Sequence, residues 1–276
     1  LDQPVVYPSK FGAYESHPSL ANLDPSESNP SAANLAAMNS ALTTLLHRPT
    51  RQEQALFWKH RPWCQKNAKS LDLFLASVPW SKPGALQLSY LLLDRWASPT
   101  QPLDAIQILN KNHLEPRFRE HAVRTLHRLS DSELAEVLLQ LVQSLKHEIS
   151  HDSPLARFLL VRALFNQNQI GHYFYWHLKA CMQMPVYRDR FSLVLEVYLR
   201  YCSSFRQELW TQTLIYNRLI TVASELKTIK DPTKRIPFLH DKMTQMANQG
   251  LPNPLGSGPN VPMPSTFQLP ISCNLM

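Results

Sequence analysis

Residues 130–145 read SDSELAEVLLQLVQSL, and this stretch decides the fold class. Ser130 and Glu133 form a capping box, in which a hydroxyl and a carboxylate satisfy the free amides of a helix's first turn. The apolar residues that follow recur at steps of three and four, which is the spacing of one face of an α-helix. They are Leu134, Val137, Leu138, Leu141, Val142 and Leu145. The stretch therefore predicts an amphipathic helix that begins after Ser130.

The same signals recur on both sides of this helix. Thr50-Arg51-Gln52-Glu53 is a second capping box, and Glu115-Pro116 and Asp152-Ser153-Pro154 each put a proline at a first helical position, where its missing N–H is not needed. Another apolar stripe runs through Phe118, Ala122, Leu126 and Leu129. We predict helices over 34–47, 50–62, 68–77, 83–95, 102–110, 116–128, 131–147, 154–167, 170–183, 187–203 and 206–229. Short connectors make sequential helices antiparallel neighbours, so the predicted fold is an all-α superhelix of antiparallel helix pairs.

Both ends of the chain are irregular in composition. Five prolines lie between Pro4 and Pro30, and six lie between Pro252 and Pro270, near Gly250, Gly256 and Gly258. Proline lacks a backbone donor and has a fixed φ, so neither end is expected to be continuous helix or central strand. Val5-Val6-Tyr7 is the one short strand that the sequence suggests. The chain opens on Leu1 rather than Met, and we expect it to be a piece of a longer protein.

Composition excludes several classes of protein. The four cysteines lie far apart with no CxxC pair, which argues against a disulfide scaffold or a cysteine-rich zinc module and suits a reducing cytosol. Only 6 glycines are present, so phosphate-binding glycine loops are not expected. No apolar run reaches membrane-spanning length, and no secretory leader is recognisable. The net charge of +7 weakly favours anionic partners.

Two groups of histidines raise the question of a metal site. His147-Glu148-Ile149-Ser150-His151 matches the zinc-protease pattern HExxH, in which both histidines share one helix face. Here one helix ends near His147 and the next begins at residues 152–154, so His151 is expected in a turn. His172 and His177 lie in a strongly aromatic helix, for which simple burial is the favoured interpretation. We therefore expect no metal, catalytic or cofactor-binding residues, although a zinc hydrolase at His147 and His151 remains an alternative.

A basic stripe offers an interaction surface. Arg117, Arg124 and Arg128 recur at helical spacing with His121 and could contact phosphate on RNA or lipid headgroups. A solvated face opposite the core is the favoured interpretation, and no aromatic residue interrupts the stripe to stack on bases. The sequence has neither a GxxxxGK loop nor the Asp-Phe-Gly motif of kinases, so the residues by themselves indicate a helical scaffold.

Several segments, in order along the chain, resemble the helical (PIK accessory) domain of phosphoinositide 3-kinases. They are residues 57–64 (FWKHRPWC), 122–126 (AVRTL), 131–134 (DSEL), 138–148 (LLQLVQSLKHE), 151–160 (HDSPLARFLL) and 170–179 (IGHYFYWHLK). The resemblance covers about residues 45–230. It implies a right-handed superhelix of the armadillo/HEAT kind, and it places the HExxH stretch where one helix of the family ends and the next begins.

The resemblance also implies a domain order. Residues 1–31 would be a connector from a preceding β-sandwich domain, residues 32–248 the PIK helical domain, and residues 249–276 a linker towards a kinase domain that the chain does not include. Phe267-Gln268-Leu269-Pro270 would approach the kinase N-lobe. The parent enzyme would use ATP and magnesium to phosphorylate the 3-hydroxyl of phosphoinositides. It would be cytoplasmic and recruited to acidic membranes. This chain would carry no kinase active site and would act as a scaffold and regulatory module.

The resemblance further bears on a regulatory subunit. Gly171–Trp176 and His151–Pro154 lean towards class I of the family, with class II close behind. In class I enzymes, acidic residues before the Trp-x-His-Arg helix face the basic phosphopeptide pocket of a Src-homology regulatory subunit. Arg48 and Arg51 stand at the corresponding places here, so that contact is expected to be missing or remodelled. The alternative hypothesis is a free-standing helical-repeat module that binds an acidic partner or RNA through Arg117, Arg124 and Arg128, with nucleic acid the less favoured partner.

Overall fold

The protein is described by a computed structural model that covers residues 26–27, 29–44, 47–82, 84–97 and 102–250. The expected strand at Val5–Tyr7 and the segment Phe267–Pro270 lie outside these residues, as do most of the connector 1–31 and the linker 249–276. The chain divides into two compact units, unit 1 (Leu1–Phe158) and unit 2 (Leu159–Met276). All regular structure in the described ranges is helical, which confirms the all-α prediction. None of the described helices has the length and hydropathy needed to cross a membrane.

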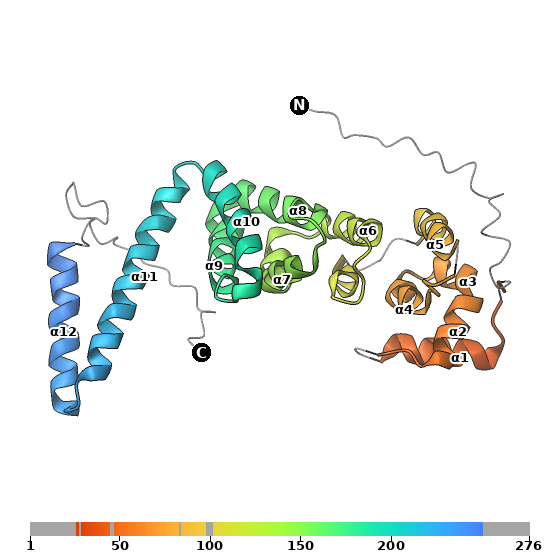
Figure 1. Cartoon of the computed structure of the whole chain (residues 1–276), viewed down its shortest axis with the longest axis horizontal. Helices are drawn as coiled ribbons and strands as arrows, with labels where there is room; N and C mark the ends of the chain where they lie inside the picture. Colours follow the sequence, from red (N-terminus) through yellow and green to blue (C-terminus); the bar gives the residue numbers. More distant parts are fainter. Residues whose placement is uncertain (1–25, 28, 45–46, 83, 98–101, 251–276) are drawn as a thin grey trace. The chain divides into compact units, whose positions relative to one another are not determined.

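Short helices packed in pairs build unit 1. In chain order they are α1 (Ala32–Thr43), α2 (Arg51–Lys59), α3 (Arg61–Lys66), η3 (Ala68–Ser70), α4 (Leu71–Ser77), α5 (Ala85–Asp94), η4 (Pro102–Leu109), α6 (Pro116–Leu126), α7 (Asp131–Ser144) and η5 (Leu145–His147). Helix α1 packs against α2, α2 against α4, and η4 against both α6 and α7 (Figure 1). The sequence predicted a helix over 102–110, and the structure forms a 3₁₀ helix there.

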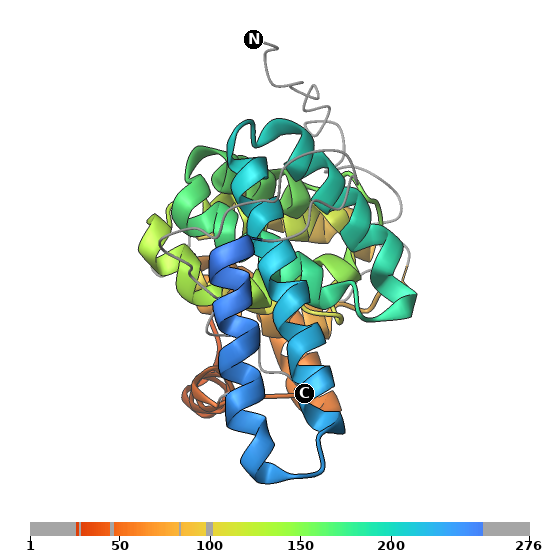
Figure 2. The ribbon, with the colours of Figure 1, turned by 90° about the vertical axis from the view of Figure 1, so that its left-hand side faces the viewer.

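Longer helices build unit 2. Helix α8 (Pro154–Phe165) runs across the boundary between the units and is followed by η6 (Gln167–Gly171, a π-turn), α9 (His172–Cys181), η7 (Pro185–Tyr187), α10 (Arg188–Tyr201), α11 (Phe205–Thr228) and α12 (Pro232–Gln249). Helix α9 packs against α10, and α11 and α12 lie side by side (Figure 2). Ile215 and Val222 of α11 pack with Met246 of α12 in a small core.

The predicted helix starts are confirmed by the hydrogen bonds of each first turn. Thr50 and Ser130 each accept from the backbone N–H of the glutamate three residues on, and that glutamate accepts in return, so both capping boxes are complete. Glu115 caps α6 through the N–H groups of Arg117 and Phe118. Ser153 Oγ accepts from the N–H of Ala156 at 3.2 Å at the start of α8.

The predicted apolar stripes form the core of unit 1. Leu134, Leu138, Leu141, Val142 and Leu145 are buried, and Val137 is half-buried. The stripe of α6 is buried over its whole predicted length, through Phe118, Ala122, Leu126 and Leu129. Both stripes were predicted correctly because a 3.6-residue period brings such residues onto one face of a helix.

The helix predicted over 50–62 is broken at His60, and Pro62 explains the break. Proline cannot supply the N–H that would bond to the carbonyl of Trp58 four residues earlier. The Arg61 guanidinium takes that place, since its Nη1 donates to Trp58 O at 2.8 Å. The buried His60 ring donates from Nδ1 to the carbonyl of Glu27 at 3.1 Å and accepts from Asn34 at 3.3 Å.

Helix α12 is absent from the predicted set, which ends at residue 229. It begins with the same signal as α8, because Asp231 accepts from the N–H of Thr233 and Pro232 follows the cap. Pro237 inside the helix is the local feature that argues against continuation. The helix nevertheless continues beyond Pro237, where Phe238 and Met246 pack on α11. Lys242 Nζ also forms an ion pair of 3.1 Å with Glu225 Oε2.

Candidate functional site

One arginine of α6 lies almost wholly inside unit 1. Arg119 is 1% exposed, and its Nε donates at 2.8 Å to Oε1 of Glu148, which is itself buried. The remaining donors reach the backbone carbonyl oxygens of Asn110, His113 and Ser144 at 3.3, 3.0 and 3.4 Å. A buried guanidinium must have both a counter-charge and acceptors for its donors, and this one has them. The contacts join the turn before α6 to the end of α7.

The HExxH stretch is split between two local conformations. His147 ends η5, whereas His151 is exposed in the bend before α8. Glu148, which a zinc hydrolase would need as its base, is the counter-charge of Arg119. Across the described ranges, no group of three or more His, Cys, Asp or Glu side chains is arranged to hold a metal ion. The geometry therefore gives Glu148 a structural role.

Positive charge surrounds this end of unit 1. Burial lowers the pKa of His147 most, and Lys146, Arg119 and Lys111 lower it further, while Glu148 acts in the opposite sense. Burial and the neighbouring cations thus both disfavour protonation of His147.

The arginines of the predicted basic stripe are largely paired with acidic side chains. The Arg117 guanidinium lies 4.5 Å from the ring centre of Tyr90 and 3.7 Å from Oδ1 of Asp94. Arg124 Nη2 lies 2.6 Å from Oε1 of Glu120, one helical turn back. Pairing of this kind uses donors that a phosphate would otherwise take. The stripe is therefore less positive than its sequence indicates.

The rest of the stripe adds little to it. Arg128 is exposed beyond the end of α6. Burial lowers the pKa of His121, and the nearby Arg124 lowers it further, so this imidazole stays neutral near pH 7. Arg117 and Arg124 are thus paired and His121 is neutral, which leaves little positive charge on this stripe for binding phosphate.

Arg48 and Arg51 lie together at the start of α2. Arg51 is the first residue of the helix, Arg48 precedes the Thr50 cap, and both side chains are exposed. Neither has an ion pair with another described residue. The nearby carboxylate of Glu53 is occupied, because it accepts from the Thr50 N–H at 2.7 Å and lies 3.1 Å from His47. The two arginines are thus exposed cations without an ion pair in the described part of the chain, just before and at the start of α2.

Helix α9 is buried through Phe174, Tyr175 and Trp176, as the sequence predicted, whereas Tyr173 is exposed. Trp176 Nε1 donates to Gln212 Oε1 of α11 at 3.2 Å, and the Tyr175 hydroxyl lies 2.5 Å from Thr213 Oγ1. Burial lowers the pKa of His177 to about 4, with His172 adding to the effect. These polar groups specify how α9 packs on α11.

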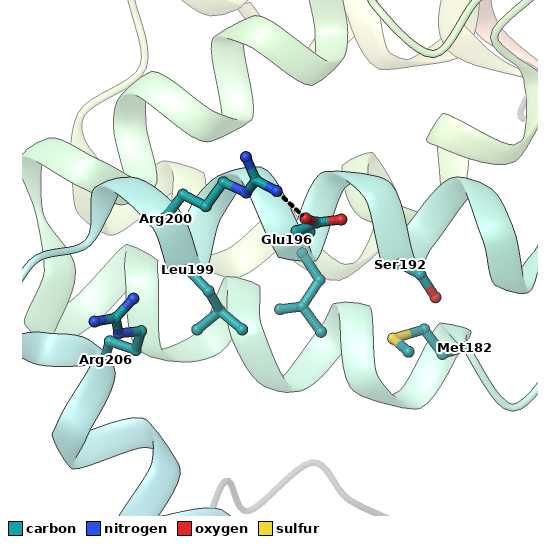
Figure 3. A pocket seen from close by; sticks show the side chains of 7 residues that line it. Met182, Ser192, Glu196, Leu199, Arg200 and Arg206 are labelled. Carbon is teal, nitrogen blue, oxygen red and sulfur yellow. Dashed lines mark hydrogen bonds and ion pairs between the residues drawn. The ribbon is translucent and has the colours of Figure 1, made fainter.

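A shallow pocket of about 390 Å³ opens on α10 in unit 2 (Figure 3). It is lined by Met182, Ser192, Leu195, Glu196, Leu199, Arg200 and Arg206. Its carboxylate is already paired, because Glu196 Oε1 lies 2.5 Å from Nη2 of Arg200, as the dashed line in Figure 3 marks. The wall thus combines a paired carboxylate with aliphatic surface, which is more suitable for contact with another surface than for catalysis.

Comparison with known proteins places most of the chain in one protein family. Residues 34–211 match the family described as phosphoinositide 3-kinase family, accessory domain (PIK domain). The chain is 40% identical over 178 residues to phosphatidylinositol 3-kinase 1 of Dictyostelium discoideum, and the match covers 64% of the chain and 11% of that relative. It is 33% identical over 220 residues to phosphatidylinositol 3-kinase 2 of the same organism, covering 80% of the chain and 11% of that relative.

A human relative shows the same pattern of coverage. The chain is 34% identical over 179 residues to the phosphatidylinositol 4-phosphate 3-kinase C2 domain-containing subunit beta of Homo sapiens, covering 64% of the chain and 11% of that protein. The chain thus spans about a tenth of the length of the curated relatives that it matches.

Proposed function

Because the chain belongs to the phosphoinositide 3-kinase accessory-domain (PIK domain) family, we propose that it is the helical scaffold and regulatory module of a phosphatidylinositol 3-kinase. The module itself is non-catalytic. The parent enzyme uses ATP and magnesium in a separate kinase domain to phosphorylate the 3-hydroxyl of phosphoinositides. A β-sandwich domain and the kinase domain of the same polypeptide are its neighbours. The parent is cytoplasmic and acts at acidic membranes.

The buried pair of Arg119 and Glu148 is the observation that supports a scaffold role most strongly. Glu148 is the glutamate of the HExxH stretch, and its contact with Arg119 joins separate helices. A buried ion pair is weak evidence of added stability, but in some proteins such a pair fixes how the helices pack. A spine on which other domains dock needs fixed geometry, and a structural Glu148 supplies it.

The charge before α2 supports an altered regulatory contact. Arg48 and Arg51 are exposed and cationic where the family resemblance implies acidic residues facing a basic pocket. Like charges repel, so a basic regulatory surface gains nothing from this part of the module. A regulatory subunit that does bind must therefore use another surface or opposite charge.

The test measures lipid kinase activity of the native polypeptide that carries this segment. An antibody against residues 130–180 isolates that polypeptide from cells with the wild-type gene, with Leu141→Asp or with Arg124→Ala. We expect a band well above 31.7 kDa and transfer of ATP phosphate to the 3-hydroxyl of phosphatidylinositol. Leu141 is fully buried, so aspartate there unfolds the module and removes the activity. Arg124→Ala changes only an exposed pair and keeps it.

Two results would contradict the proposal. The first is phosphorylation of lipid by the purified 276-residue chain alone, which would place catalysis inside the module. The second is a native polypeptide without 3-hydroxyl kinase activity, which would separate this chain from the activity of its relatives.

A further inference from the structure

A groove runs along unit 1 between the end of α1, helix α4 and the turn from η4 to α6. It consists of two cavities of about 570 and 510 Å³. Both cavities are lined by His47, Arg48, Asp72, Lys111 and Asn112, so they adjoin along one shared wall. Ligand-binding pockets commonly have volumes of about 300–1,000 Å³, so the groove is large enough for several side chains.

The charge of this groove is positive. Arg48, Lys69 and Lys111 line it from three separate segments, and all three side chains are exposed. In the part of the chain that the structure describes, none of the three has an ion pair. Asp72 is the carboxylate among the lining residues, and it accepts from Nε2 of His113 at 2.7 Å. Three cations therefore face the groove against one carboxylate that already has a partner.

The lining also offers apolar contact. Leu42, Leu73 and Ile106 line the larger cavity. Trp80 lines the smaller one and is 50% exposed, with its ring packed edge-on against Phe118 at 6.2 Å between centroids. Exposed tryptophan and arginine are the side chains that most often anchor protein partners. A half-exposed indole beside Arg48 and Lys111 is therefore a suitable anchor.

We propose that this groove binds an acidic peptide segment of a partner protein. Its Asp or Glu carboxylates contact Arg48, Lys69 and Lys111, and an apolar side chain packs on Trp80. The side-chain amides of Gln107 and Asn112 line the same groove and can bond to the backbone of an extended peptide. A hydrated phosphate uses the cations but gains nothing from Trp80 or the aliphatic wall, so the mixed lining favours a peptide.

This inference goes beyond the proposed function, and it needs only the residues of unit 1. It adds the chemistry of a partner to a module whose scaffold role does not specify one. Failure of the groove would leave the lipid kinase test unaffected, because that test uses Leu141 and Arg124, neither of which lines the groove.

The experiment selects ligands for the 276-residue chain from a display library of random ten-residue peptides. We expect enrichment of sequences that combine two or more Asp or Glu with Leu, Phe or Trp. Fluorescence anisotropy then gives the Kd of an enriched peptide for the wild type and variants. Arg48→Glu with Lys111→Glu should weaken binding by about tenfold or more, since like charges then meet the peptide. Trp80→Ala should weaken it several-fold.

Matched controls separate the groove from general basicity. Lys227→Glu with Lys230→Glu changes the net charge by the same amount at two exposed sites in unit 2 and should leave Kd unchanged. Circular dichroism should show the same melting temperature for the charge variants, since their exchanged side chains are exposed. Rising salt should weaken binding, as expected for contacts between exposed charges.

Three outcomes would overturn the inference. One is a selection that enriches no acidic peptides. Another is an enriched peptide whose Kd is the same for the wild type and the Arg48→Glu/Lys111→Glu variant. The third is binding of inositol hexakisphosphate or inorganic phosphate that matches the peptide in affinity and does not depend on Trp80, which would make the groove a site for small anions.

Discussion

Arg119 and Glu148 are 29 residues apart in the sequence, yet Nε of the arginine donates to Oε1 of the glutamate at 2.8 Å inside unit 1. This contact explains two features at once. It gives the HExxH stretch a structural meaning, and it accounts for a charged side chain on the core side of α6. The pair also joins α6 to the residue that follows η5, just beyond α7, and α7 is the helix whose sequence decided the fold class.

Removing one member of this pair should be strongly destabilising. Arg119→Met leaves Glu148 buried without a counter-charge and three backbone carbonyls without their donor. We expect a loss of about 3–5 kcal/mol in the free energy of unfolding, measured by urea denaturation. The double variant Arg119→Met/Glu148→Leu should recover part of it, because no buried charge remains.

The exposed pair of Arg124 and Glu120 is the control for this prediction. Arg124→Met removes an ion pair of the same type on the same helix, and it should cost under about 1 kcal/mol. Equal losses from the Arg119 and Arg124 variants would show that burial of the first pair does not matter.

Gly171 is required by close packing on Tyr198. A Cβ at this position would lie 2.3 Å from the Tyr198 hydroxyl and 2.7 Å from the carbonyl oxygen of Ala163. Gly171→Ala should therefore cost about 1–3 kcal/mol in thermal or urea unfolding, as overpacking usually does.

A second substitution tests the cause of that loss. The Tyr198 hydroxyl is buried without a hydrogen-bond partner among the described residues, so Tyr198→Phe alone should be nearly neutral. In the double variant the loss from Gly171→Ala should become smaller. Strictly additive losses would mean that the hydroxyl is not the obstacle.

The capping box of α7 predicts a local response to pH. Hydrogen bonds from the Ser130 side chain and then its backbone N–H hold the pKa of Glu133 below its usual value of 4.5. A carboxyl whose folded pKa is lowered stabilises the fold above its unfolded pKa, and that contribution is lost as pH falls through the folded value. Ser130→Ala should raise the Glu133 pKa, as followed by NMR titration of its carboxyl carbon. An unchanged titration would argue against the cap.

His177 predicts a loss of stability between pH 6.5 and about 4. Burial, with His172 adding to it, lowers its folded pKa to about 4 from the usual 6.5. Below pH 6.5 the unfolded chain binds a proton that the folded chain resists, so stability falls with pH until about pH 4 and then levels off. The fall attributable to this group is about 3 kcal/mol.

The measurement for His177 is the unfolding free energy of wild type and His177→Gln at several pH values. Glutamine does not titrate, so the variant should show a shallower slope across this range. Parallel slopes would assign the pH dependence to other groups, of which His172 is the nearest candidate because burial lowers its pKa too.

The helices were predictable because their signals are local. Each capping box lies within four residues, and each apolar stripe repeats along one helix, so neither needs a distant partner. Two helices were predicted wrongly, and both contain a proline. The predicted helix over 50–62 ends at His60 because of Pro62. Helix α12 was not predicted, and it continues beyond Pro237 while it packs on α11.

The candidate sites were less predictable than the helices. The sequence marked Arg117, Arg124 and Arg128 by their spacing but could not show that Asp94 and Glu120 pair with two of them. It missed Arg119, whose only local sign is its helical spacing from the core residues Val123 and Leu126. Lys69 and Lys111 were also missed, because nothing near either residue indicates a shared groove with Arg48.

The sequence by itself determined that this protein is a succession of helices with known starts and known core faces, and its motifs identified the family. Tertiary structure alone decided which charges are buried, which are paired and which face a groove. The physical reason is range. Helix caps and apolar stripes are set by neighbours along the chain, whereas the partner of Arg119, the acceptor for Trp176 and the wall around Arg48 come from segments that only folding brings together.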